Sequence, residues 1–212
     1  MRAVGRSLLL GISIALVAAG CGDDDGQTTT APTTTVGSTT TAGTSTTTQT
    51  STTTQASTTT AADDNTFASS EYRFQVSYPA GWTEERDSFG TIVIFLSPLS
   101  EGDNFSENVN VVVEDLGGAS VTLEEYMDAT LTQLNAFITD FDLYDDDADT
   151  LGGVPARTIA YTGSQDGVEL EWVQTIALHD GKAFVITYTG AEDFEFFLPV
   201  AATIFESFEF VD

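Results

Sequence analysis

The chain has 212 residues, 41% of them hydrophobic, and a formal net charge of −27, with 33 acidic residues against six lysines and arginines. This balance excludes nucleic acid as a partner, because phosphate binding needs clustered basic side chains. It also disfavours direct attraction to an anionic lipid surface. The single cysteine excludes an intramolecular disulfide.

Residues 1–20 have the pattern of an export signal. Arg2 and Arg6 give a positive start without any acidic residue, and the apolar run Leu8–Ala19 follows. This run is shorter than the roughly 20 residues of a membrane-spanning helix, so a cleaved signal peptide is the better interpretation.

Cys21 follows Ala18, Ala19 and Gly20, a sequence that resembles the bacterial lipobox, with Ala18 where leucine or valine is usual. The resemblance implies that Cys21 receives a diacylglyceryl group and becomes the new N-terminus. Two or more acyl chains anchor a protein stably, whereas one binds with a constant of only about 10⁴ M⁻¹. We predict lipidation at Cys21 and a place on the extracytoplasmic face of the cell membrane. The alternative is an ordinary signal peptide with an incidental cysteine.

Residues 21–66 are predicted to form a tether. Gln27 to Ala62 contains no charged residue, and twenty of the thirty-four residues from Gln27 to Thr60 are threonine. Such a segment has little to bury against the entropy of ordering, so we expect it to stay disordered. A spacer between membrane and domain is the main interpretation, and a recognition role for the threonines is the alternative.

Residues 67–212 are predicted to form one domain. Its first half contains apolar and β-branched runs typical of strands at Tyr72–Tyr78, Thr91–Leu96 and Val109–Val113. Thr122 and Glu125 fit a capping box, and apolar residues at helical spacing follow as far as Ile138.

The second half starts with Asp140–Asp149, which we interpret as an acidic loop. A strand is expected near Ala156–Thr162, and Asp180-Gly181 predicts a hairpin between strands Glu169–His179 and Lys182–Thr189. A last helix is expected at about Asp193–Phe205, with Pro199 as its kink or its true start. The order of strands and helices predicts an α+β fold with a central antiparallel sheet flanked by helices.

The domain resembles the PsbP-like family in four places. These are Phe74 to Trp82 (FQVSYPAGW), Leu123 to Tyr126 (LEEY), Leu151 to Ala156 (LGGVPA) and Ile204 to Phe208 (IFESF). The resemblance implies the Mog/PsbP fold, shared with DcrB-type and LpqN-like bacterial lipoproteins. It also implies binding or assembly of other proteins rather than catalysis, and it supplies no catalytic residues. The photosystem role does not transfer, because it depends on basic residues and this domain has only four.

Few side chains are candidates for catalysis or metal binding. His179 is the only histidine, and no motif joins it to Ser97, Ser164 or Ser207, so we expect a surface histidine. A single histidine without an available cysteine also makes a zinc site improbable.

The Asp140–Asp149 segment has six carboxylates suited to calcium, but it lacks the glycine and the glutamate of an EF-hand loop. A solvated acidic loop is therefore the main interpretation, and a calcium site is the alternative.

Two pairs of adjacent acids, Glu84-Glu85 and Glu124-Glu125, could in principle serve a hydrolase. Neighbouring residues on a helix or strand point apart, so neither pair is a credible acid and base couple. Trp82 and Trp172 are expected in the core.

We therefore predict no catalytic, metal or cofactor residues, and lipidation at Cys21. The predicted partners are an envelope protein or cell-wall component, together with the membrane through the lipid. The alternatives are a carboxylate-dependent cell-wall hydrolase and a carrier of a small hydrophobic or metal ligand. An enclosed pocket would favour a carrier.

Overall fold

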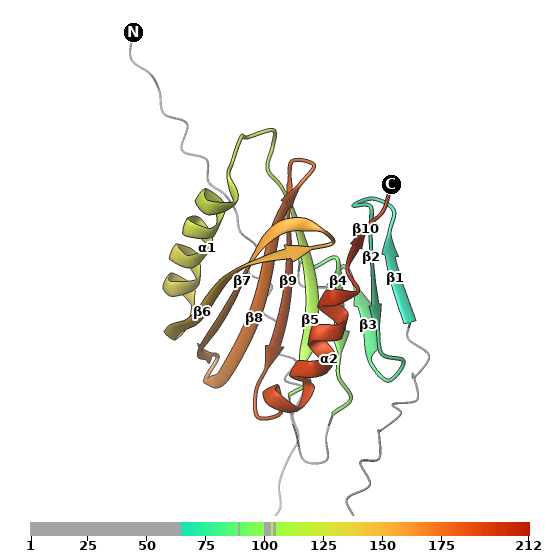
Figure 1. Cartoon of the computed structure of the whole chain (residues 1–212). Helices are drawn as coiled ribbons and strands as arrows, with labels where there is room; N and C mark the ends of the chain where they lie inside the picture. The colour runs from blue at the N-terminus through green and yellow to red at the C-terminus, as the bar shows by residue number, and fades with distance from the viewer. Residues whose placement is uncertain (1–64, 89, 100–102, 104) are drawn as a thin grey trace, which may run out of the picture. The chain divides into compact units, whose positions relative to one another are not determined.

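The computed structural model describes residues 65–88, 90–99, 103 and 105–212, which contain ten strands and two helices (Figure 1). The strands are β1 (Asn65–Ser69), β2 (Phe74–Tyr78), β3 (Thr83–Arg86), β4 (Val93–Leu96), β5 (Asn108–Asp115), β6 (Thr139–Leu151), β7 (Val154–Gln165), β8 (Val168–His179), β9 (Lys182–Gly190) and β10 (Glu209–Phe210). The helices are α1 (Leu123–Phe137) and α2 (Phe194–Glu206).

The strands form two antiparallel sheets. The larger has the order β3-β4-β5-β9-β8-β7-β6, and the smaller has the order β1-β2-β10. Helix α1 packs against β6, β7 and β8, whereas α2 packs against β2, β5 and β9. The α+β fold with an antiparallel sheet and flanking helices is confirmed.

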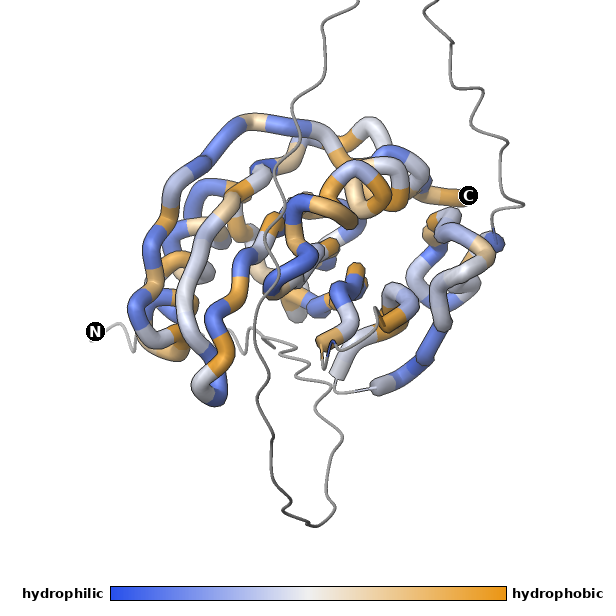
Figure 2. Tube along the Cα trace, turned by 90° about the horizontal axis from the view of Figure 1, so that it is seen from below, coloured by the Kyte–Doolittle hydropathy of each residue, from blue (hydrophilic) through white to orange (hydrophobic). Residues whose placement is uncertain are grey.

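The buried apolar side chains of the sheets and helices form two cores. The first joins α2 to both sheets and includes Trp82, and the second lies under α1 and includes Trp172. Both tryptophans are buried, which confirms their predicted core positions. Figure 2 shows apolar and polar residues alternating in short runs along the strands, as expected where each strand has side chains on both faces.

Helix α1 begins as its sequence predicts. The Thr122 hydroxyl accepts a hydrogen bond from the Glu125 N–H at 3.2 Å, and the Glu125 carboxylate accepts one from the Thr122 N–H at 2.9 Å. These two bonds satisfy amide groups that have no partner within the helix. Tyr126, Met127 and Leu134 are buried on its inner face.

Helix α2 lacks such a cap, because Asp193 makes no side-chain capping hydrogen bond there. The predicted position of this helix is correct, and Pro199 lies inside it rather than at its start. Proline at this depth removes one backbone hydrogen bond, so tertiary contacts must hold the helix. Phe194, Phe197, Ala201 and Ile204 supply them as buried residues.

The interpretation of Asp140–Asp149 as a loop is wrong. These residues belong to β6, a thirteen-residue strand at the edge of the large sheet, paired with β7. Exposed aspartates are unfavourable for a strand by propensity, but on an edge they block pairing with another chain. The stabilisation from pairing with β7 along most of the strand outweighs the low strand propensity of the aspartates.

The predicted tether boundary is also two residues too late, because β1 begins at Asn65. Asn65 and Thr66 are exposed polar residues that pair with Tyr78 and Ser77 of β2, so strand pairing and not their own composition makes them part of a strand. The predicted signal peptide, Cys21 and the tether as far as residue 64 lie outside the described residues. Within the described part of the chain, neither helix has the length and apolar character needed to cross a membrane.

Candidate functional site

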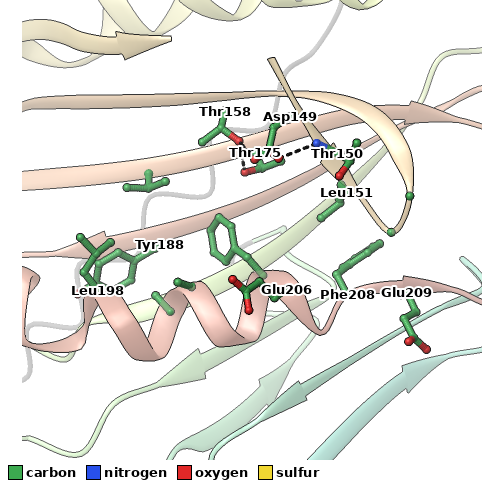
Figure 3. A pocket seen from close by; sticks show the side chains of 16 residues that line it. Asp149, Thr150, Leu151, Thr158, Thr175, Tyr188, Leu198, Glu206, Phe208 and Glu209 are labelled. Atoms are coloured by element: carbon green, nitrogen blue, oxygen red, sulfur yellow. Dashed lines mark hydrogen bonds between the residues drawn. The ribbon is translucent and has the colours of Figure 1, made fainter. Parts of the chain in front are cut away.

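A pocket of about 700 Å³ lies between α2 and the large sheet (Figure 3). Its walls come from five parts of the chain: the turn and strands of the β6–β7 hairpin, β8, β9, α2 and the segment that follows α2. The volume falls within the range of about 300–1,000 Å³ typical of small-ligand sites. The pocket is therefore large enough for an apolar group of a partner or for a small ligand.

The Gly152-Gly153 turn lets the β6–β7 hairpin close over one end of the pocket. Both glycines have positive φ, 55° and 78°, which glycine adopts without steric cost. A Cβ on Gly152 would lie 2.8 Å from the Phe210 ring. The LGG sequence thus places Leu151, which is 1% exposed, as part of the pocket lining.

Apart from Glu206, the lining of the pocket is apolar on the side of α2 and β9. Ala201, Phe208 and Tyr188 are buried there, next to Leu198 and Phe205. The Tyr188 hydroxyl donates a hydrogen bond to the Phe194 carbonyl at 2.7 Å, so it holds the start of α2. Burial raises the pKa of Tyr188 well above its ordinary value, so this tyrosine stays protonated.

The polar groups on the sheet side of the pocket bond to one another. The Thr158 hydroxyl donates to the Asp149 carboxylate at 2.7 Å and lies 2.7 Å from the Thr175 hydroxyl. The other oxygen of Asp149 accepts from the Thr150 N–H. Figure 3 shows Glu206 on α2 across the pocket from this group.

The charge of the lining is wholly negative. Its three charged residues are Asp149, Glu206 and Glu209, and none of the described residues that line it is lysine, arginine, histidine or cysteine. Glu209 accepts a hydrogen bond from the Gln75 side chain at 2.8 Å. This arrangement favours an apolar group that is neutral or positively charged at its polar end, and it opposes an anion.

A family model described as DcrB matches residues 75–196, which is more than half of the chain. The chain belongs to the DcrB family.

Solved structures show the same fold at low sequence identity. Cyanobacterial PsbP (CyanoP) from Synechocystis sp. PCC 6803 is 18% identical, with a TM-score of 0.54 over 74% of this chain and 97% of that one. LpqN of Mycobacterium tuberculosis, described as involved in cell envelope biogenesis, is 14% identical, with a TM-score of 0.56 over 70% and 91%. The Ran-binding protein Mog1p of Saccharomyces cerevisiae is 10% identical, with a TM-score of 0.50 over 71% and 96%. Together with the DcrB match, these structures confirm the predicted PsbP/Mog-like fold. No curated protein matches the chain in sequence.

The acidic segment of this DcrB-family domain does not form a loop that could wrap around calcium. Successive side chains of a strand point to opposite faces, so the aspartates of β6 are divided between the two faces of the strand. Asp146 instead pairs with Arg157 on β7, and Asp149 bonds to Thr158.

The described residues contain one group of three potential metal ligands within 4.8 Å, and none of the three comes from β6. Asp103, Glu107 and Asp193 form it, close to the start of α2. Burial, with a contribution from the other two carboxylates, raises the pKa of Glu107.

Ser97, Ser164 and Ser207, which no motif joins to His179, have partners of their own. The Ser207 hydroxyl bonds to the Ser77 carbonyl and to the Ile204 carbonyl, so it joins α2 to β2. The Ser97 hydroxyl donates to Glu107 at 3.4 Å. Ser164 lies on β7, opposite Thr139. His179 packs against Phe210, with 4.2 Å between ring centroids.

The two pairs of adjacent acids have structural partners. Glu84 accepts a hydrogen bond from the Tyr78 hydroxyl at 2.8 Å and pairs with Arg86, while Glu85 is exposed on the same strand. Glu125 caps α1, and Glu124 is exposed in its first turn. Neither pair lines the pocket.

Sequence reasoning missed the pocket itself. Its residues are separated by up to sixty positions, from Asp149 to Glu209, and no motif connects them. The LGG turn was the one local signal that marked its edge.

Proposed function

We propose that this DcrB-family chain is an extracytoplasmic lipoprotein, anchored through Cys21, whose domain is a non-catalytic binding or assembly module for an envelope protein. The pocket between α2 and the sheet supports the proposal, because it is preformed and has an apolar lining. In this function it receives an apolar side chain of the partner. The similarity to LpqN, itself described as involved in cell envelope biogenesis, favours the same location.

The anchor is tested by replacing Cys21. Cys21→Ser removes the sulfur that would carry the diacylglyceryl group, so the variant should lose the lipid that holds the chain at the membrane. Metabolic labelling with a palmitate analogue should mark the wild type and leave the variant unlabelled. An unlabelled wild type would contradict the anchor.

The pocket is tested by filling it from its rim. Ala202 is exposed and lines the pocket, whereas its neighbour Thr203 is equally exposed on α2 and does not line it. Ala202→Trp should abolish photo-crosslinking to envelope proteins from a probe at Thr150, and Thr203→Trp should preserve it. Equal crosslinking by both variants would mean that the partner binds outside the pocket. A wild type that captures no protein reproducibly would overturn a protein-binding role.

A carrier of a small hydrophobic ligand is the second candidate, favoured by the volume of about 700 Å³. Native mass spectrometry of the chain from its own membrane should then show a bound molecule in the wild type and in Thr203→Trp. Ala202→Trp should lack it. A protein of bare mass in all three samples would argue against the carrier.

A further inference from the structure

The few basic side chains of the domain are concentrated at one point. From Asp63 onward the chain has thirty acidic residues against four lysines and arginines and one histidine. Three of these five, Arg73, His179 and Lys182, line a single small pocket of about 190 Å³. It is separate from the pocket beside α2, and the two share no residue.

This small pocket lies where two turns meet, at the same end of the strands in Figure 1. One turn joins β1 to β2, and the other is the Asp180-Gly181 turn between β8 and β9. Arg73 Nη2 lies 2.9 Å from Asp180 Oδ2, which links two positions 107 residues apart. Both side chains remain more than half exposed, so the pair is accessible to a ligand.

The backbone holds Arg73 in an unusual conformation. Its φ of 54° is in the left-handed region that residues other than glycine seldom adopt, and the Arg73 carbonyl accepts a hydrogen bond from the Val211 N–H at 2.9 Å. Such conformations persist where the surroundings determine them, often at binding sites. Here the result is a guanidinium aimed at Asp180.

Lys182 has no acidic side chain within 4.0 Å among the described residues. Its cross-strand neighbour Asp115 uses its carboxylate to accept the Gly117 N–H at 2.7 Å. An unpaired ammonium is notable in a domain that has thirty acidic residues against four lysines and arginines. The ammonium is therefore available to an anion from outside.

We propose that this pocket binds an oxyanion, a carboxylate or phosphate group, between Lys182 and Arg73. The Asp180 carboxylate accepts a hydrogen bond from the Arg73 guanidinium, and an incoming oxyanion would compete with this carboxylate for the same donors. Lysine adds a point charge that pairs with either kind of oxyanion. The proposal does not depend on the function of the pocket beside α2.

The acidic surroundings limit the affinity without preventing binding. Glu71 and Asp180 line the same pocket and oppose an anion directly. At physiological ionic strength the Debye length is about 8 Å, so most other carboxylates of the domain are screened. We therefore expect millimolar binding that tightens when Asp180 is neutralised.

The test is an amide NMR titration of the full lipoprotein in micelles of a neutral detergent, at constant ionic strength. Inorganic phosphate and acetate are titrated separately, and the tighter of the two identifies the kind of oxyanion. The wild type should show saturable shifts at Gly181 and Lys182. Lys182→Gln should weaken the binding about tenfold, whereas Arg157→Gln, with the same charge change on β7, should leave it unaltered.

Asp180→Asn separates a binding site from a purely structural ion pair. Asn-Gly suits the same turn, in which residues 180 and 181 have φ of 48° and 72°, so the fold is retained. If the pocket binds oxyanions, this variant should bind about fivefold more tightly, since an internal competitor is lost. The proposal is overturned by a wild type without saturable shifts, by Lys182→Gln binding like the wild type, or by Asp180→Asn binding no tighter.

Discussion

Helices α1 and α2 pack against the sheet by different means. Helix α1 starts with a complete capping box and packs on β6, β7 and β8. Helix α2 has no side-chain cap at Asp193, contains Pro199 and borders the pocket of about 700 Å³. The helix with strong local signals thus has a structural role, while the helix that depends on tertiary contacts forms the wall of the candidate site.

The largest expected effect concerns the core beneath α2. Phe208 is 2% exposed and stacks on Phe74 with 5.1 Å between ring centroids, so Phe208→Ala should cost about 3–5 kcal/mol of unfolding free energy. Urea unfolding followed by circular dichroism measures this. Phe196→Ala, on α2 itself but at a side chain that is 73% exposed, should cost less than about 1 kcal/mol. Similar losses would mean that burial in this core does not decide the stability of the region around α2.

Pro199 interrupts the backbone hydrogen bonds of α2 and has no counterpart in α1. Pro199→Ala restores a backbone donor in the interior of α2 and should raise the unfolding free energy by about 1–3 kcal/mol. The exposed Pro98→Ala lies outside the helices and serves as the control, with a change near zero. A less stable Pro199→Ala would show that the packing of α2 needs the bend at proline.

The capping box of α1 predicts a smaller effect. Thr122→Ala removes the hydroxyl that accepts the Glu125 N–H, which should cost about 0.5–2 kcal/mol. Thr132→Ala is the matched control, because Thr132 is exposed within the same helix and its hydroxyl donates to the Asp128 carbonyl. Thermal unfolding of both variants distinguishes loss of the cap from loss of any threonine.

The smallest expected effect is on the pH dependence of stability. It should have opposite signs for Glu107, near the start of α2, and Glu125, at the start of α1. Burial raises the pKa of Glu107, which contacts the Ala191 N–H, above the ordinary value of 4.5. Its contribution to stability is therefore complete below that value and is lost as the pH rises through the folded-state pKa. Glu107→Gln should be more stable than the wild type at about pH 7.5, with the difference vanishing near pH 4.

Glu125 at the start of α1 should behave in the opposite way. Hydrogen bonds from Thr122 lower the pKa of Glu125, so its contribution is present at neutral pH and is lost as the pH falls through the folded-state pKa. Glu125→Gln should thus be the less stable protein at about pH 7.5 and equal to the wild type in acid. Melting temperatures between about pH 4 and pH 7.5 test both variants. A change of the same sign in both at neutral pH would contradict the environments assigned to Glu107 and Glu125.

Much of the fold follows from the sequence because its signals are local. The Thr122–Glu125 box predicts the start of α1, and Asp180-Gly181 predicts the turn of the β8–β9 hairpin. Alternating apolar residues mark the main strands, and Trp82 and Trp172 are in the core as expected. The short strands β1, β3 and β10 escaped prediction, since they have two to five residues and at most one buried side chain each.

The sequence by itself determined the capped helix, the central hairpin and the PsbP-like class, because capping, turn formation and hydrophobic periodicity act within a few residues. Only the tertiary structure decided that the aspartates of Asp140–Asp149 form an edge strand, since the ladder with β7 outweighs their low strand propensity. It alone brings Asp149 to the same pocket as Glu209, and Arg73 to the same pocket as Lys182. Sites made by chain segments this far apart depend on strand pairing and packing over long distances, which no short sequence pattern encodes.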